Sequence, residues 1–145
     1  MEINLTLEIE ENGVVILKDY FIAKPEAKVK NTVSEYARYF NETCQGWTNI
    51  PEYNLLFLKM MQEHCNELLK SRGHLFLNEV YHILGMSRTK AGSIVGWVYD
   101  TKNPKGDNYI DFGIYDPRNQ KFVNGEEKTA LLDFNVDGSI LYHFN

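Results

Sequence analysis

The most regular pattern in the sequence lies in residues 54–72, where apolar residues recur every three or four positions and charged residues occupy the other faces. This periodicity predicts an amphipathic α-helix with one buried stripe. Gly73 follows, where helices commonly end in left-handed geometry. A helix with one apolar face must bury it against another layer, so the rest of the chain has to supply that layer. The buried stripe is expected to contain Leu58, Met61, Cys65 and Leu68, widened by Leu55 and Leu69.

Two elements are predicted before this helix. Residues 2–9 alternate polar and apolar side chains, and this period of two predicts a strand with one buried face. Asn12-Gly13 favours a tight hairpin turn because both residue types tolerate positive φ, so residues 14–22 are expected to form the returning strand. Residues 26–44 carry apolar side chains at helical spacing and predict a first amphipathic helix.

The second half of the chain is patterned mostly as strands. A short helix is expected after Asn78, which can cap it, and Gly85 is expected to end it. Loops rich in turn residues separate the apolar runs that follow, which indicates antiparallel strands with short connections. The expected strands cover residues 93–99 and 109–115, and a last hairpin around Asp137-Gly138 joins residues 131–134 to residues 139–144.

These elements predict an α+β fold. We expect a single two-layer domain over residues 1–145, in which an N-terminal β-hairpin and two amphipathic helices pack with a C-terminal antiparallel sheet. Residues 1–73 would supply the hairpin and the helices, and residues 74–145 a short helix and the strands. A chain of 145 residues with 43% apolar and 13% aromatic residues can bury a core of its own.

The charge balance and the short apolar runs exclude several classes of function. The chain has 15 basic and 20 acidic residues, and its net charge of −5 gives no general attraction to nucleic-acid phosphates. No apolar run approaches the roughly 20 residues of a membrane span. The N-terminus does not read as a secretory signal, so we expect a cytoplasmic protein with no membrane partner. Cys44 and Cys65 are expected to be reduced thiols packed as small apolar groups.

A helix-turn-helix over residues 77–97 is an alternative interpretation, in which Arg88 and Lys90 would face DNA phosphates. Its second helix would cover residues 89–97. Against this, residues 93–99 are rich in β-branched side chains and interrupted by glycine, which favours a strand. A nucleic-acid partner is therefore not expected.

Residues 133–138 match the first half of a calcium-binding loop. Asp133, Asn135 and Asp137 place oxygen ligands at alternate positions, and a glycine follows for the sharp turn. The twelfth position of such a loop should supply a bidentate glutamate, but here it is Phe144. We therefore interpret the segment as a hairpin turn, keep those three residues as weak cation candidates, and expect no cofactor.

Glu79 and His82 lie three residues apart on the short predicted helix, so their side chains can meet. A metal site would need at least two further ligands with matching geometry, which makes an ordinary histidine the simpler interpretation. No Cys–His arrangement in the sequence has a local signature of nucleophilic catalysis. We therefore expect that the protein is not an enzyme.

Aromatic side chains in the strand-rich half are the main binding candidates. Most aromatic residues of a small domain lie in its core, but tyrosine and tryptophan at strand edges can anchor a partner when they are exposed. An acidic residue among them adds charge to such a surface. The candidate ligand-binding or partner-binding residues are Trp97, Tyr99, Tyr109, Asp111 and Tyr115.

Several short motifs lie between residues 74 and 138: Phe76–Tyr81, Leu84-Gly85, Val95–Tyr99, Gly106-Asp107, Asp111–Gly113 and Leu132–Gly138. They resemble small proteins of unknown function encoded in phages and mobile elements of Gram-positive, Firmicutes-type bacteria. The resemblance covers about half of the chain. It implies a phage or mobile-element origin but no activity, because that family has no assigned catalytic residues.

Small size, mild acidity and the lack of an assembled catalytic set favour a non-catalytic binding protein of phage origin. Its partner would be a host or phage protein, such as a host defence or regulatory factor that it inhibits. Two alternatives stay open. A virion or tail component would form a homo-oligomer through the strand-rich half. A sequestering protein would hold a small ligand, such as a nucleotide signal, near Trp97, Tyr99 and Asp111.

Overall fold

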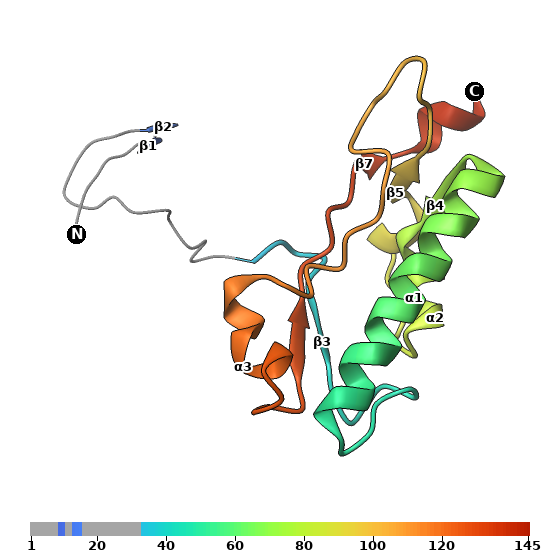
Figure 1. The fold of residues 1–145 in the computed structure, drawn as a ribbon. Coiled ribbons are helices and arrows are strands. Elements are labelled where there is room, and N and C mark those ends of the chain that lie inside the picture. Colours follow the sequence, from blue (N-terminus) through green and yellow to red (C-terminus); the bar gives the residue numbers. More distant parts are fainter. Residues whose placement is uncertain (1–8, 11–12, 16–32) are drawn as a thin grey trace. The chain divides into compact units, whose positions relative to one another are not determined.

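The computed structural model describes residues 9–10, 13–15 and 33–145 (Figure 1). The chain divides into two compact units, Met1–Thr32 and Val33–Asn145. Helices and antiparallel strands occur together, which confirms the α+β class. A single domain spanning both units stays a prediction.

The first unit contains the part of the predicted hairpin that the structure describes. Strand β1 (Ile9–Glu10) pairs with strand β2 (Gly13–Val15) in antiparallel orientation. The hairpin is therefore confirmed for these residues. The remainder of the two predicted strands, within residues 2–22, lies outside the described residues.

The longest helix, α1 (Pro51–Arg72), confirms the strongest sequence prediction and begins slightly earlier than expected. Pro51 suits the first helical position, because the N–H that proline lacks would be unpaired there. Gly73 ends the helix in left-handed geometry with a φ of 83°, and its N–H donates to the carbonyl of Leu69. No helix among the described residues is long and apolar enough to cross a membrane.

Strand β4 (His74–Phe76) follows α1 directly and forms one edge of a three-stranded antiparallel sheet. Its partner β5 (Val95–Val98) also pairs with β7 (Gly138–Ser139), which gives the order β4-β5-β7. Glycine is required at position 96 in β5. A Cβ on Gly96 would collide with the carbonyl oxygen of Leu75 across the sheet.

Helix α2 (Leu77–Ile83) confirms the predicted short helix. Its first turn is capped by Glu79 rather than by Asn78, because the Glu79 carboxylate accepts a hydrogen bond of 3.0 Å from the Phe76 N–H. Gly85 then turns the chain with a φ of 75°, a conformation that favours glycine.

The residues after α2 rule out the helix-turn-helix alternative. They form a 3-10 turn, η1 (Ala91–Ser93), and then strand β5, where a second helix over residues 89–97 would have to lie. The predicted strand over residues 93–99 is confirmed in its central part. All four residues of β5 are buried, which suits the β-branched side chains that signalled the strand.

A second antiparallel pairing joins strand β3 (Arg38–Phe40) to strand β6 (Ala130–Leu132). The predicted helix over residues 26–44 is therefore wrong for residues 33–44, which form turns around β3. The first part of that prediction, residues 26–32, lies outside the described residues.

Two local hydrogen bonds explain why residues 33–44 do not form a helix. Ser34 Oγ accepts from the Tyr36 N–H at 3.1 Å, and Asn41 Oδ1 accepts from the Thr43 N–H at 3.0 Å. Such bonds to the backbone two residues ahead stabilise turns at the expense of a helix. Phe40 lies between these turns, at the end of β3, and is fully buried. The helical pattern predicted that Phe40 is buried on a helix face, but it reaches the core from a strand.

The predicted C-terminal hairpin around Asp137-Gly138 is wrong. Strand β6 pairs with β3 and strand β7 pairs with β5, so the two segments belong to different sheets. The last residues form a 3-10 helix, η3 (Leu141–Phe144), rather than a strand. Before β6 the chain forms a 3-10 turn, η2 (Pro117–Asn119), where the turn residues predict a change of direction, and then the short helix α3 (Gln120–Val123), which the sequence does not predict.

Residues 109–115 form no strand ladder, so the predicted strand is wrong, but their backbone is paired with side chains. The Asn66 side-chain amide accepts from the N–H of Ile110 at 2.7 Å and donates to its carbonyl at 2.9 Å. Gln62 Oε1 accepts from the Phe112 N–H at 2.7 Å. Alternate residues of the segment are buried, as in a strand, although α1 side chains supply the partners.

Asparagine side chains pair with backbone in the same way elsewhere in the described residues. In each case the side-chain carbonyl accepts from the N–H of one residue while the side-chain NH2 donates to the carbonyl of that same residue. We call such a residue an asparagine bracket. The other brackets are Asn54 on Thr48, Asn78 on Thr89, Asn108 on Asp100 and Asn119 on Leu131.

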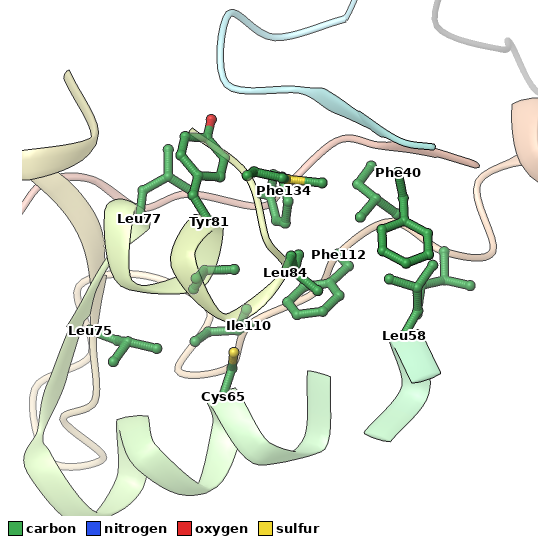
Figure 2. Packing of buried hydrophobic residues seen from close by; sticks show 14 of the residues in the cluster. Phe40, Leu58, Cys65, Leu75, Leu77, Tyr81, Leu84, Ile110, Phe112 and Phe134 are labelled. Atoms are coloured by element: carbon green, nitrogen blue, oxygen red, sulfur yellow. The ribbon is translucent and has the colours of Figure 1, made fainter. Parts of the chain in front are cut away.

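The hydrophobic core of the second unit draws on segments that are far apart in the sequence (Figure 2). Helix α1 contributes Leu58 and Cys65, helix α2 contributes Tyr81, and the segment of residues 109–115 contributes Phe112. Cys65 and Cys44 are both buried free thiols, which confirms the expectation for the cysteines. One interior therefore joins the helical and the strand-rich parts of residues 33–145.

Candidate functional site

A pocket of about 470 Å3 lies beside helix α2, and we call it the α2 pocket. Its walls come from the C-terminal part of α1, from β4, from α2 and from the loop that runs through η1. The pocket thus brings together segments that precede α2 in the sequence and segments that follow it. The lining residues are Leu68, Phe76, Asn78, Glu79, His82, Ile83, Arg88 and Ser93.

The floor of the α2 pocket is apolar. Leu68 and Ile83 pack against the core, and Phe76 stacks on Phe144 with ring centroids 5.6 Å apart. Phe144 itself is 52% exposed, so apolar surface continues from the pocket onto η3. Covering such surface contributes roughly 25 cal/mol for each Å2 removed from water.

Glu79 brings a carboxylate to the rim, but both of its oxygens are engaged. Its Oε1 accepts from Arg72 Nη2 at 2.7 Å, and its Oε2 accepts from the Phe76 N–H at 3.0 Å. The ion pair offsets the negative charge, and the backbone bond caps α2. Glu79 therefore holds α1, β4 and α2 together at the edge of the pocket.

Asn78 fixes the loop that supplies Arg88 and Ser93 to the pocket. This bracket binds the N–H and the carbonyl of Thr89 at 2.9 and 2.8 Å. Gly92 packs so closely that a Cβ there would collide with Asn78 Oδ1. Ser93 Oγ donates to the Lys90 carbonyl at 2.7 Å. The wall is therefore formed before any ligand arrives.

Arg88 and His82 are the lining residues with charged or ionisable groups that form no hydrogen bond or ion pair within the described part of the chain. Both side chains are exposed. Since Arg72 offsets the charge of Glu79, Arg88 leaves the rim with an unbalanced positive charge. A ligand that joins an apolar group to an anionic group matches this floor and rim.

Trp97, the first of the sequence-predicted binding residues, is fully buried in β5. Its indole N–H donates to both the carbonyl and the Oδ1 of Asn135 at 3.0 Å. It is therefore removed from the surface and cannot contact a partner directly. The buried indole finds a polar partner, as tryptophan N–H groups in cores usually do.

Asn135 links Trp97 to the backbone of Tyr109 and Asp111. The Asn135 side chain accepts from the Asp111 N–H at 2.7 Å and donates to the Tyr109 carbonyl at 3.0 Å. The Asp111 carboxylate is exposed and accepts from the Gly113 N–H at 2.8 Å, which closes a local turn. The backbone of these two residues is therefore structural, and the Tyr109 ring remains exposed.

Tyr99 and Tyr115 lie apart from that junction. Tyr99 is half-buried just after β5 and packs against the core. Tyr115 is exposed and lines a different hollow of about 360 Å3 with Gln120 and Asn124 of the α3 region. The structure thus does not bring the five predicted residues into one site.

The three cation candidates of the sequence, Asp133, Asn135 and Asp137, each bind a different partner. Asp133 contacts Arg118 at 3.4 Å, Asn135 binds backbone as described, and Asp137 Oδ2 accepts from the Val98 N–H at 3.1 Å. Burial, together with the negative charge of Asp107, raises the pKa of Asp137 although backbone amides lower it. No group of three or more His, Cys, Asp or Glu side chains gathers for a metal among the residues that the structure describes.

The α2 pocket is the feature that sequence patterns miss. One signal was present: Ile83 follows Glu79 by four residues, so the two side chains are neighbours on α2 and place an apolar group beside a charged one. The contributions of Leu68 and Arg88 depend on tertiary packing and have no local signature.

Comparison with known proteins gives a family. No curated protein and no solved structure matches the chain. A family model described as "Family of unknown function (DUF6353)" matches residues 10–144, which includes every element described above from β3 to η3 and every residue of the α2 pocket. The chain therefore belongs to this family of unknown function.

Proposed function

We propose that this is a non-catalytic binding protein whose site is the α2 pocket. Its ligand is a segment of a partner protein that inserts an apolar side chain and carries an acidic residue beside it. One observation carries the proposal: the floor of the pocket is apolar, while the rim combines a carboxylate, Glu79, that is paired with Arg72 and a cation, Arg88, that has no ion pair within residues 33–145.

The extent of the apolar surface favours a protein segment over a small ligand. Phe76 in the pocket stacks on Phe144, and Phe144 is exposed beyond it. A short peptide can place one side chain in the pocket and continue across η3, whereas a nucleotide would cover only part of this surface. Interfaces of this kind commonly depend on a few central anchors surrounded by a polar rim.

The fixed walls suit binding rather than catalysis. Glu79 is held by Arg72 and by the backbone of Phe76, and Asn78 is held by Thr89. Such a preformed surface loses little conformational entropy when a ligand binds. In this proposal Glu79 and Asn78 hold the walls of the pocket in place and take no part in a reaction.

The phage resemblance extends the proposal to origin and target. We propose that the protein is encoded by a phage or mobile element, acts in the cytoplasm of the bacterial host, and inhibits a host defence or regulatory protein. The resemblance supports the origin, and the α2 pocket supports recognition of a protein segment. The expected target is a host protein with an exposed segment that carries an apolar residue beside an acidic one.

The test uses a display library of short random peptides selected on the full chain. Enriched peptides should carry an apolar residue next to Asp or Glu. Arg88→Glu should weaken the binding of a synthetic enriched peptide about tenfold or more, because it replaces attraction with repulsion at the rim. Fluorescence anisotropy measures this affinity.

Lys102→Glu is the matched control. It makes the same charge change on an exposed loop residue that does not line the α2 pocket, and it should leave the affinity nearly unchanged. The proposal is wrong if no peptide is enriched, if both variants weaken binding equally, or if a nucleotide panel raises the melting temperature while peptides do not.

A further inference from the structure

Helix α1 exposes a row of large apolar side chains on the face away from the core. Tyr53, Leu56 and Met60 are 61%, 55% and 55% exposed. Their spacing of three and four residues places them on one side of the helix. We call this row the α1 stripe. It is well separated in sequence from the residues of α2 that line the proposed binding pocket.

A shallow groove of about 180 Å3 runs beside the α1 stripe, between α1 and α3. Leu55 and Leu56 line it from α1, and Phe122 and Val123 line it from α3. The groove offers a place for a side chain that projects from an apposed surface. The stripe itself supplies such projecting side chains.

The charges beside the α1 stripe indicate which partner surface is complementary to it. Glu52 and Lys59 both line the groove, and neither forms an ion pair among the described residues. They are seven residues apart, which is about two helical turns or 10.5 Å. When a second α1 lies antiparallel across this face, Glu52 of one helix comes opposite Lys59 of the other.

A two-fold axis between the two copies produces each contact twice, once in each direction. Lys59 of the first copy then meets Glu52 of the second, and Leu56 lies close to the axis between the two ion pairs. An isologous interface needs this self-complementarity of one patch. We propose that the α1 stripe is the surface through which two copies of this chain form an antiparallel dimer.

The first test is the concentration dependence of the molar mass of the full chain, measured by sedimentation equilibrium. The wild type should form dimers, and Leu56→Glu should weaken association at least about a hundredfold, because a charge would be buried at the axis. Leu141→Glu makes the same change at another exposed leucine, in η3, and should dimerise normally. Circular dichroism confirms that each variant is folded.

The decisive test exchanges the charges. Glu52→Lys and Lys59→Glu should each weaken homodimers about tenfold, since two attractive pairs become repulsive in each case. A mixture of the two single variants should form heterodimers as tightly as the wild type, because every pair is again of opposite sign. Combining both changes in one chain should likewise restore the homodimer.

The proposal is overturned if the wild type is monomeric up to about 1 mM, the range of very weak complexes. It is equally overturned if dimers tolerate Leu56→Glu or if the mixed charge variants do not associate. Arg88→Glu should leave dimerisation intact. Sedimentation equilibrium therefore tests the dimer and fluorescence anisotropy of the peptide tests the α2 pocket, so either proposal can fail without the other.

Discussion

At the residue scale, side-chain amides carry much of the backbone pairing outside the regular elements. A side-chain amide has one carbonyl and one NH2, so it can satisfy the N–H and the C=O of one backbone residue at once. Asn119 shows this most clearly. It is 3% exposed, brackets Leu131, and also donates to the Gly113 carbonyl at 3.0 Å.

Asn119→Ala should lower the free energy of unfolding by about 2–3 kcal/mol, because it removes three hydrogen bonds of a buried side chain and leaves part-buried backbone groups of Leu131 and Gly113 without these partners. Asn103→Ala is the control, since that side chain is exposed in a loop, and its effect should stay within about 0.5 kcal/mol. Urea denaturation measures both. Equal effects of the two substitutions would show that the brackets do not stabilise the fold.

Cys65 gives a prediction about pH. Burial, reinforced by the negative charge of Glu79, raises the pKa of its thiol to about 12. The folded pKa lies above the unfolded value of about 8.5, so this stabilising contribution is complete below that pH and is lost as pH rises toward the folded value.

The advantage of the wild type over Cys65→Ala in unfolding free energy should therefore shrink between about pH 8.5 and pH 10, by up to about 1.4 kcal/mol per pH unit. Denaturation of both proteins across this range gives the difference directly. Cys44→Ala serves as the comparison for loss of a buried thiol. A wild-type advantage at Cys65 that is constant with pH would contradict the assigned burial of a neutral thiol.

At the element scale, the long repeating pattern of α1 could be predicted with the fewest alternatives. Helix α1 has 22 residues, enough for its apolar stripe to repeat many times and for Gly73 to mark its end. Strand β3 has only three residues, and a helical spacing of apolar residues occurred there by coincidence. The hairpin predicted around Asp137 failed because local turn residues do not reveal which distant strands pair.

Two glycines that end elements differ in their surroundings. Gly73 and Gly85 have φ values of 83° and 75°, but a Cβ on Gly73 would meet nothing within 4 Å, whereas on Gly85 it would lie 2.6 Å from the backbone nitrogen of Gln45. Gly73→Ala should therefore cost about 1 kcal/mol of stability, and Gly85→Ala clearly more than about 2 kcal/mol. Thermal and urea denaturation of the two variants compare them. A larger cost at Gly73 would contradict this packing around Gly85.

At the scale of the whole molecule, the α+β class could be predicted because it follows from the separate helix and strand patterns of the two halves. The candidate site could not. Leu68, Phe76 and Arg88 come from three different segments, and their meeting depends on how α1, β4 and the η1 loop pack around α2. The aromatic residues favoured by the sequence serve the fold instead where they are buried, as Trp97 is.

Binding at the α2 pocket is tested most directly by chemical-shift mapping of an enriched peptide on the isotope-labelled full chain. If the α2 pocket is the binding site, the largest amide shifts should fall on His82, Ile83, Arg88 and Ser93 around it. Shifts that fall instead on the α1 stripe, or on Tyr109 and Tyr115, would contradict it.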